Sequence, residues 1–424
     1  MTAVIGILNK NGMTMAADSA VTVTGGNQKK IYNTANKIFT LSKHHPIGIM
    51  VYSSSTFMTT PWEIIIKLYR KQLGEDSFET VTDYKNNFLD FLREKDFFTS
   101  EDTQKFMLEN FTYWNLTSLK DRIIKNLSDD KSEEDLTIEF QENILEDLNN
   151  NIKSFDGATN ILNDFKEYTI GQFKAYAEDI IKKVISEIFD GIKLTESIKN
   201  AIIELYFLHL RTPNFIGLET GLVFGGYGEN EIYPSIVSIK IAEVFDNRLR
   251  YYDDLSDKIT DRNNGSIMPF AQTDVINMFI KGIDPDIDLT YITVFEKLIS
   301  KYNDTIVEIL KENQPELADK IKGIDLKPLK DEFNDELLKI KREKQIIPTV
   351  DTVAILSKED LAEMAESLIY LTYLKRRISS SEESVGGPID VAIISKGDGF
   401  IWKKRKHYFE SELNKHFMLN YFKK

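Results

Sequence analysis

Residues 2–19 read TAVIGILNKNGMTMAADS, and this stretch decides the fold that the sequence predicts. Two apolar runs, residues 3–8 and 13–17, flank the dipeptide Asn11-Gly12. Asn-Gly favours a tight turn between antiparallel strands, because both residues tolerate positive φ angles. The chain therefore begins with a predicted buried β-hairpin, and Thr2 lies at its start.

Thr2 is the first candidate functional residue. Methionine is normally removed from a chain whose second residue is small, which would leave Thr2 with both its hydroxyl and a free α-amine. A hydroxyl is a poor nucleophile without a nearby base, and an α-amine is substantially neutral near physiological pH. Thr2 would therefore carry its own base.

Length and composition limit the other possibilities. A chain of 424 residues exceeds one compact domain, so we expect two domains or one core with large insertions. The formal charge of −14 argues against a general binder of nucleic acid or anionic membranes. No cysteine is present and only five histidines, which argues against disulfides, thiolate nucleophiles and multi-histidine metal centres. We expect no metal and no cofactor.

The opening residues carry no basic segment followed by a long apolar one, and no apolar run reaches bilayer-spanning length. We therefore expect a cytoplasmic protein without a membrane segment.

Further strands and a helix follow the first hairpin. Residues 37–41 and 47–52 have the extended apolar pattern of strands. Thr60-Pro61-Trp62-Glu63 predicts a helix start, with threonine as N-cap, proline at the first helical position and glutamate placed for a capping box.

The carboxyl-terminal part of the chain also has the patterns of a strand pair and of a capped helix. Residues 385–394 and 400–402 predict a second β-hairpin around the turn at residues 397–399. The preceding residues 360–378 have helical apolar spacing, and Ser357 with Asp360 forms a plausible capping pair.

Two long blocks read as amphipathic helices. One is the stretch 91–212, which includes Ala177, Ile181, Val184, Ile185 and Ile188 at helical spacing. The other is the stretch 284–344, which includes Val294, Leu298, Tyr302 and Ile306. We expect the apolar stripes of both blocks to pack within the molecule, and the alternative is a surface for a subunit or partner.

These patterns predict an α+β fold in which two sheets are covered by helices. The expected division is a discontinuous core of residues 1–90, 213–283 and 345–405, helical insertions at 91–212 and 284–344, and a C-terminal helix at 406–424.

Thr2, the Asn11-Gly12 hairpin, residues 16–19 (AADS), residues 37–41 (KIFTL) and residues 47–50 (IGIM) together resemble the proteasome β-subunit family and its bacterial ATP-dependent relatives. These are threonine peptidases among the N-terminal-nucleophile hydrolases. The resemblance implies a four-layer αββα sandwich, here with large helical insertions. The predicted C-terminal hairpin is similar to the last hairpin of that family.

The resemblance implies that Thr2, Asp18 and Lys37 form the catalytic centre. A lysine ammonium would disfavour protonation of the α-amine and stabilise negative charge near the hydroxyl, and an aspartate would hold the lysine charged and oriented. The implied reaction is attack of the Thr2 hydroxyl on an amide carbonyl, followed by hydrolysis of the acyl-enzyme.

Four supporting residues follow from the same resemblance. Glu382 and Ser384 stand where the family has an aspartate and a serine before the glycine pair, although the glutamate and Val385 depart from its pattern. Backbone amides at Tyr52 and Ser53 are expected to bind the oxyanion.

The leading hypothesis is a threonine-type amide hydrolase that cleaves peptide or protein substrates within a homo-oligomer. An ATPase or a dedicated protein would be its partner, with no role for nucleic acid or membrane. Two alternatives remain open. One is a catalytically silent scaffold or assembly subunit, and the other is a small-molecule amidase with the same nucleophile.

Overall fold

The computed structural model describes residues 2–25, 28–94, 99–127, 132–155, 157, 160–215, 219–379, 385–407, 409–410, 412–416 and 419.

The predicted first hairpin is confirmed. Strands β1 (Ala3–Asn9) and β2 (Gly12–Ala17) pair antiparallel, with Asn9 opposite Gly12 at the turn. Every residue of both strands is buried, which places this hairpin inside the molecule.

The hairpin forms the middle of a five-stranded antiparallel sheet with the order β12-β1-β2-β13-β14. Its other strands are β12 (Gly265–Ala271), β13 (Asp390–Ser395) and β14 (Gly399–Lys404). Because β13 and β14 pair antiparallel, the predicted C-terminal hairpin is also confirmed.

A second five-stranded antiparallel sheet has the order β11-β10-β9-β6-β5. Its strands are β5 (Ile38–Thr40), β6 (Ile47–Ser53), β9 (Thr220–Gly226), β10 (Ser235–Phe245) and β11 (Arg248–Lys258). Two small hairpins complete the strands: β3 (Val21–Gly25) with β4 (Gln28–Tyr32), and β7 (Thr56–Phe57) with β8 (Thr60–Pro61).

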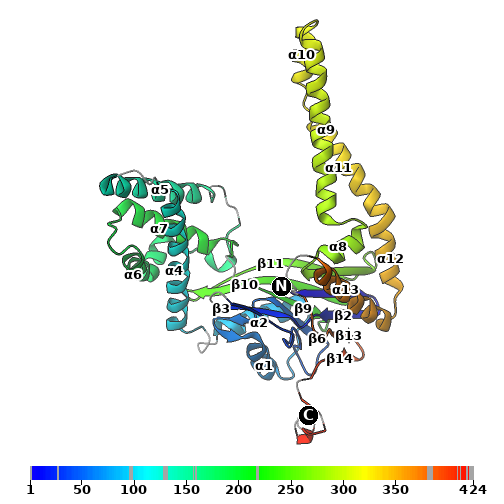
Figure 1. Ribbon diagram of the computed structural model, residues 1–424. Coiled ribbons are helices and arrows are strands. Elements are labelled where there is room, and N and C mark those ends of the chain that lie inside the picture. Colours follow the sequence, from blue (N-terminus) through cyan, green and yellow to red (C-terminus); the bar gives the residue numbers. More distant parts are fainter. Residues whose placement is uncertain are drawn as a thin grey trace.

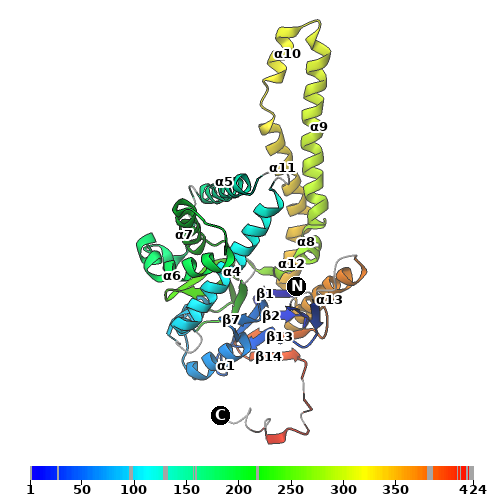
Figure 2. The same ribbon diagram turned by 60° about the vertical axis from the view of Figure 1, so that its left-hand side comes forward.

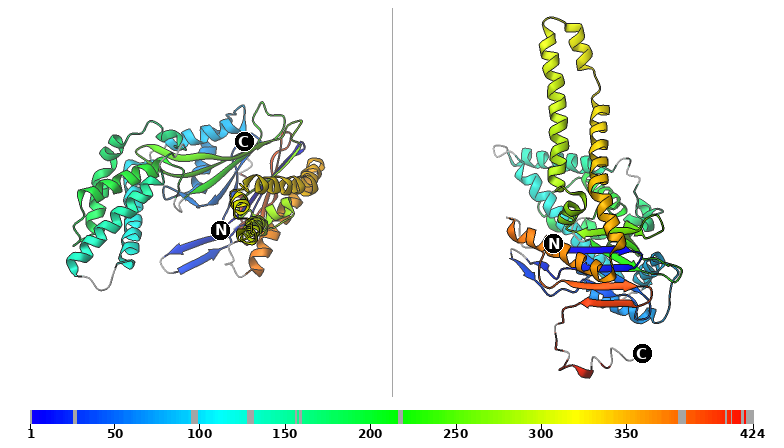
Figure 3. Two further views of the ribbon diagram at one scale, coloured as in Figure 1. Left: turned by 90° about the horizontal axis from the view of Figure 1, so that it is seen from above. Right: turned by 90° about the vertical axis from the view of Figure 1, so that its right-hand side faces the viewer.

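The two sheets pack face to face. Val4 and Met13 of the first sheet share one buried cluster with Met50, Val223 and Ile236 of the second. Figure 3 (left) shows the sheets lying against one another with helices outside them. The inner side chains are apolar on both sheets, so their burial supplies the main driving force for this contact.

Helices cover the outer face of each sheet. Helices α12 (Ile347–Ile355) and α13 (Lys358–Ile378) share a buried cluster with β1 and β2. Helices α1 (Trp62–Leu73) and α2 (Val81–Glu94) share another with β6, β9 and β10. The fold is mixed α and β with antiparallel sheets, so the α+β class is confirmed.

The expected start of α1 is wrong in detail. The helix begins at Trp62, Pro61 is its N-cap, and no side chain caps it. Thr60 and Pro61 instead form β8, and Glu63 bonds to Lys67 one turn further along. The predicted capping of α13 is confirmed, because Ser357 and Asp360 form a reciprocal capping box.

After the end of α2, the described residues of the stretch 91–212 form four long helices and one short 3-10 turn. These are α4 (Glu101–Lys125), α5 (Glu133–Lys153), η1 (Asn163–Phe165), α6 (Ile170–Ile188) and α7 (Glu196–Arg211). The five α6 residues singled out by their spacing are all buried in a shared cluster that these helices form. Figure 1 shows the block on one side of the sheets.

The helices of the stretch 284–344 are more exposed than those of the stretch 91–212. After α8 (Asp274–Lys281), helices α9 (Pro285–Lys311), α10 (Pro315–Lys322) and α11 (Lys327–Lys341) lead through a π-helical turn, η2 (Arg342–Ile346), into α12. Figures 1 and 2 show α9 to α11 as a long hairpin that projects away from the sheets. Neither α9 nor α11 has a buried residue.

The expectation that this stripe packs within the molecule is wrong for three of its residues. Val294, Leu298 and Tyr302 are exposed by 46%, 59% and 68%. The physical reason is that α9 has two apolar stripes and α11 covers the other one, where Phe295 stacks on Phe333 with ring centroids 3.8 Å apart.

The expected helix at 406–424 falls partly on residues outside the described part, and Lys406 and His407, which follow β14, are not helical. Among the described residues, no helix is long and apolar enough to cross a membrane.

Gly221 offers a test of how β6 and β9 pack. A Cβ atom at this position would lie 2.0 Å from the Tyr52 ring, so Gly221→Ala must displace that ring. We expect a loss of about 1–3 kcal/mol in the free energy of unfolding, measured by urea denaturation. Gly397→Ala is the matched control, because nothing lies within 4 Å of its Cβ position. Equal stability of the two variants would contradict the packing described.

Candidate active site

Thr2 and Lys37 line one cavity of about 200 Å³ at the end of the two sheets. Thr2 directly precedes β1 and is 6% exposed, while Lys37 directly precedes β5. The rest of the wall comes from the start of β3, the segment that leads into β5, the end of β6 with the residues after it, and the end of β8 with the start of α1. Its residues are Val21, Ala35, Asn36, Phe39, Val51, Tyr52, Ser53, Ser54, Ser55, Thr56, Pro61, Trp62 and Glu63.

Lys37 is buried, with an exposure of 4%. Its Nζ lies 2.6 Å from Oδ1 of Asp18 and donates a second hydrogen bond of 2.6 Å to the carbonyl of Ala20. An ammonium group has three N–H donors, and these two bonds are those it makes to described residues. One N–H of Lys37 is thus left for a group within the cavity.

Asp18 is held by four donors. Oδ1 accepts from the Ala3 amide (3.0 Å) and from Lys37, and Oδ2 accepts from the amides of Ala20 and Gly386 (both 3.1 Å). A carboxylate that is 1% exposed needs this compensation, because burying an unpaired charge is strongly unfavourable. These bonds determine where Lys37 can lie.

Burial lowers the pKa of the Lys37 ammonium from its ordinary value, and the charge of Asp18 and its hydrogen bond oppose that shift. Nearby Lys406 lowers it further, while Asp390 raises it. A buried cation whose proton is held less tightly than in water suits a site where charge develops during a reaction.

The glycine pair before β13 docks onto the same aspartate. In addition to the Gly386 amide bond, the Ser19 amide donates to the Gly386 carbonyl (3.0 Å) and the Ser19 hydroxyl donates to the Pro388 carbonyl. Gly387 has φ +76°, which explains a glycine there. Sequence reasoning did not anticipate this contact, although the adjacent glycines were its signal. The supporting residues expected from the sequence, Glu382 and Ser384, lie outside the described residues.

Ser53 and Tyr52, the two oxyanion positions expected from the sequence, lie at the end of β6 and both line the cavity. Ser53 has φ +70°, a left-handed conformation that is uncommon for a residue other than glycine. Backbone strain of this kind is often retained where it positions a functional group. The Tyr52 ring lies against Phe270 and beneath the Lys240 ammonium, and burial raises the pKa of its phenol.

The turn between β12 and α8 lies next to Thr2. The Gln272 amide donates to the Thr2 carbonyl (3.1 Å), and Ala271 has φ +64°. Arg376 of α13 in turn donates to Gln272 and to Asp274. This contact fixes the backbone of Thr2 from the side opposite Asp18, which bonds the following residue, Ala3.

Polar groups from the start of α1 border the cavity, and sequence reasoning missed them. The Asn36 side-chain amide donates to Glu63 (3.3 Å), which also accepts from Lys67 (2.5 Å). The hydrogen bonds from Lys67 and Asn36 lower the pKa of the Glu63 carboxyl against the effect of its partial burial. No motif connects these residues in the sequence, so only the fold reveals their proximity.

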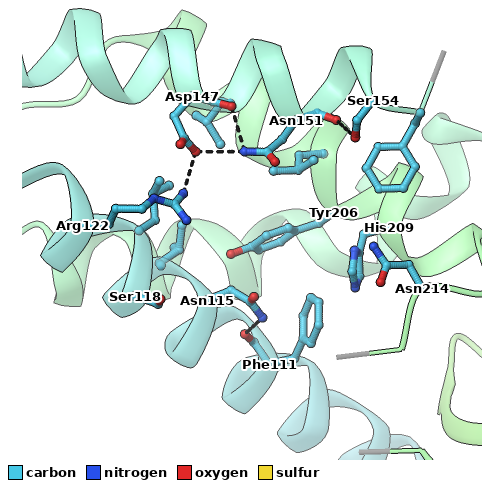
Figure 4. A pocket seen from close by; sticks show the side chains of 15 residues that line it. Phe111, Asn115, Ser118, Arg122, Asp147, Asn151, Ser154, Tyr206, His209 and Asn214 are labelled. Carbon is cyan, nitrogen blue, oxygen red and sulfur yellow. Dashed lines mark hydrogen bonds and ion pairs between the residues drawn. The ribbon is translucent and has the colours of Figure 1, made fainter. Parts of the chain in front are cut away.

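A second cavity, of about 250 Å³, lies among α4, α5 and α7. Figure 4 shows the Arg122–Asp147 ion pair at one end and His209 beside Asn214 at the other. Burial, together with the charge of Arg250, lowers the pKa of His209 to about 4, so its imidazole is neutral near pH 7. The two charged residues lining this cavity already pair with one another. None of the residues singled out from the sequence lines it, so the Thr2 cavity remains the candidate active site.

The described residues contain no group of three or more histidine, cysteine, aspartate or glutamate side chains placed to hold a metal ion.

Comparison with known proteins finds similarity among solved structures but not among family models or curated proteins. No family model matches, and no curated protein matches. Two similar solved structures are the helical assembly of the Anbu complex from Pseudomonas aeruginosa (9% identity, TM-score 0.32) and an Anbu (Gly-1) mutant from Hyphomicrobium sp. strain MC1 (11% identity, TM-score 0.27). Each alignment covers 100% of this chain and 97% of the other.

These findings correct the family assignment made from the sequence. The resemblance to proteasome β-subunits and their ATP-dependent relatives finds no support in any family model, and the two solved structures named above are Anbu proteins at low TM-scores. The motifs that suggested the assignment are short strands and turns that many antiparallel folds share. The site must therefore be judged from its own geometry.

The ion pair between Asp18 and Lys37 predicts strong coupling between the two side chains. We expect Asp18→Asn and Lys37→Met each to lower the free energy of unfolding by about 3 kcal/mol, because each leaves a buried charge unpaired. The double variant should lose at least 1 kcal/mol less than the sum. Urea denaturation of all four proteins measures this, and additive losses would contradict the pairing. Lys105→Met, which breaks an exposed pair with Glu101, is the control and should cost less than about 1 kcal/mol.

Proposed function

We propose that this protein is an amide hydrolase whose nucleophile is the Thr2 hydroxyl, with Asp18 and Lys37 as its charged partners. The observation that carries the proposal is the buried Lys37 ammonium, which bonds to Asp18 at 2.6 Å and lines the same cavity as Thr2. Hydrophobic replacements of a buried ion pair are often neutral or stabilising, so stability alone is a weak reason for such a pair.

Cleavage of the Met1–Thr2 peptide bond would activate the site by releasing the α-amine of Thr2. The amine would take the proton of the Thr2 hydroxyl as its oxygen attacks the carbonyl carbon of an amide. The carbon–nitrogen bond then breaks, the leaving amine takes that proton, and an ester to Thr2 remains. Water then adds to this ester with the Thr2 α-amine again as base, which releases the acid and restores the Thr2 hydroxyl.

Lys37 and the backbone at the end of β6 would stabilise the negative charge that develops during this reaction. The Lys37 ammonium favours the neutral form of the α-amine and stabilises the oxygen of Thr2 as it loses its proton. The Ser53 and Tyr52 amides are the proposed donors to the oxyanion, and the left-handed conformation of Ser53 supports a positioning role for this turn. Asp18 is a positioning residue, because it acts through Lys37.

The proposed substrate is a peptide or protein amide. A cavity of about 200 Å³ has room for one side chain beside the scissile bond, and its wall includes Val21, Phe39, Val51 and Trp62. A homo-oligomer and a protein partner that delivers substrate stay predictions.

The proposal also includes the division of the chain. The core would be the four layers built from residues 1–90, 213–283 and 345–405, and the helices at 91–212 and 284–344 would be insertions into it.

A β-lactone probe tests the nucleophile. We expect purified protein to begin at Thr2 and to gain one probe mass on that residue, as read by intact-mass and peptide mass spectrometry. Thr2→Ala should gain none. Lys37→Met should begin at Thr2 and react at least about tenfold more slowly, because the α-amine base and the attacking oxygen lose their neighbouring charge. Lys10→Met changes a residue at the turn of the β1–β2 hairpin and breaks an exposed ion pair with Asp261, and this variant should react like the wild type.

The outcomes separate the alternatives. A chain that retains Met1 and does not react contradicts the proposal and favours a silent scaffold. A chain that reacts but cleaves only small amides from a mixed library of peptides and acyl-amides favours a small-molecule amidase.

A further inference from the structure

Helix α9 carries an apolar stripe with no partner among the residues that the structure describes. Its large side chains are exposed by between 46% (Val294) and 68% (Tyr302), and the stripe consists of Ile287, Tyr291, Val294, Leu298, Tyr302 and Ile309. Spacings of three, four and seven residues place them on one face of the helix. Because α11 packs on a different face, through Phe295 and Phe333, the stripe is free along the length of the hairpin.

Four charged residues follow one edge of this stripe. Lys297 and Lys301 come first, and Asp304 and Glu308 follow. Lys297, Lys301 and Glu308 directly precede the stripe residues Leu298, Tyr302 and Ile309, and Asp304 is three residues after Lys301 and four before Glu308, so all four lie along the same edge. All are exposed, and their side chains have no hydrogen bond or ion pair to the described residues.

This order of charges is only partly compensated within the helix. Lys297 and Lys301 are four residues apart, as are Asp304 and Glu308, and like charges at that spacing destabilise a helix, whereas Asp304 follows Lys301 and Lys311 follows Glu308 at the favourable spacing of three. A compensating set of charges on a partner would remove this cost. The partner must present acids opposite residues 297–301 and bases opposite residues 304–308.

The same helix, running in the opposite direction, meets this requirement. Antiparallel alignment about a two-fold axis between residues 302 and 303 places each residue n opposite residue 605 − n of the second copy. Lys297 then meets Glu308 and Lys301 meets Asp304, and symmetry makes each pair twice. The same register places Leu298 level with residue 307 of the second copy, two residues or about 3 Å along the helix from Ile309, so the part of the stripe within the overlap meets its own apolar side chains.

We propose that α9 pairs antiparallel with α9 of a second copy of this chain. The interface is isologous, since one patch contacts itself across a two-fold axis. Figures 1 and 2 show that the hairpin extends well beyond the sheets, so the two cores would lie at opposite ends of the paired helices. The overlap runs over residues 294–311, about 27 Å of helix. The proposal is independent of the proposed hydrolase activity.

Single cysteines test the register, because the natural chain has none. Tyr302→Cys would lie one residue along the pair from its own copy, and a short bismaleimide should link two copies in high yield. Ile287→Cys lies on the same stripe but would be 31 residues from its own copy, about 46 Å, and should not link. Linking of both variants means a parallel pair, and linking of neither means no pair at this face, so either result overturns the proposal.

Charge exchange in the Tyr302→Cys background tests the partner. Lys301→Glu and Asp304→Lys should each raise the half-maximal linking concentration about tenfold, because like charges then meet at the axis. An equimolar mixture of the two variants should recover the original value, since each supplies the charge that the other needs. Lys311→Glu, half a turn round the helix from Tyr302, is the control and should change nothing. A mixture that links no better than either variant alone would overturn the proposal.

Discussion

The ion pair between Lys37 and Asp18 is the interaction on which the arrangement of the sheets around Thr2 depends. Asp18 ends the first sheet's hairpin, and Lys37 begins the second sheet at β5. The Val51 amide on β6 donates to the Lys37 carbonyl, and the Gly386 amide before β13 donates to Asp18. Two buried charges with so many fixed partners have one low-energy arrangement, so the pair determines how the two sheets meet beside Thr2.

The pair is also a reason to assign chemistry to this cavity and not to the larger one. Among α4, α5 and α7, Arg122 and Asp147 neutralise one another, and Arg122 is half exposed at 54% of its side chain. At the Thr2 cavity the ammonium is buried and has a donor to spare, and the neighbouring β6 turn holds Ser53 in a strained conformation. A buried charge and local strain beside a hydroxyl are the features expected of a pre-organised site.

Local patterns predicted much of the fold but only part of the site. The Asn11-Gly12 turn and the Ser357–Asp360 capping box are short-range signals, and both are confirmed. Pro61 misled the prediction for α1, because a Thr-Pro pair suits a helix start as well as the short bridge that it forms here. The contacts of Gly386 with Asp18 and of Gln272 with Thr2 join positions hundreds of residues apart, which no local pattern can reveal.

The two helical blocks also show what a local sequence pattern cannot reveal. A period of 3.6 residues states that a helix has an apolar face, but not what covers that face. On α6 the stripe from Ala177 to Ile188 is covered by neighbouring helices, whereas on α9 it faces outward. The two stripes differ in the sequence by the charged residues that lie beside them. Lys182 of α6 has its acid, Glu178, four residues before it in the same helix, and the pairs of like charge on α9 have none at that spacing. A stripe bordered by pairs of like charge four residues apart is therefore better read as a surface for another chain than as a surface for the core.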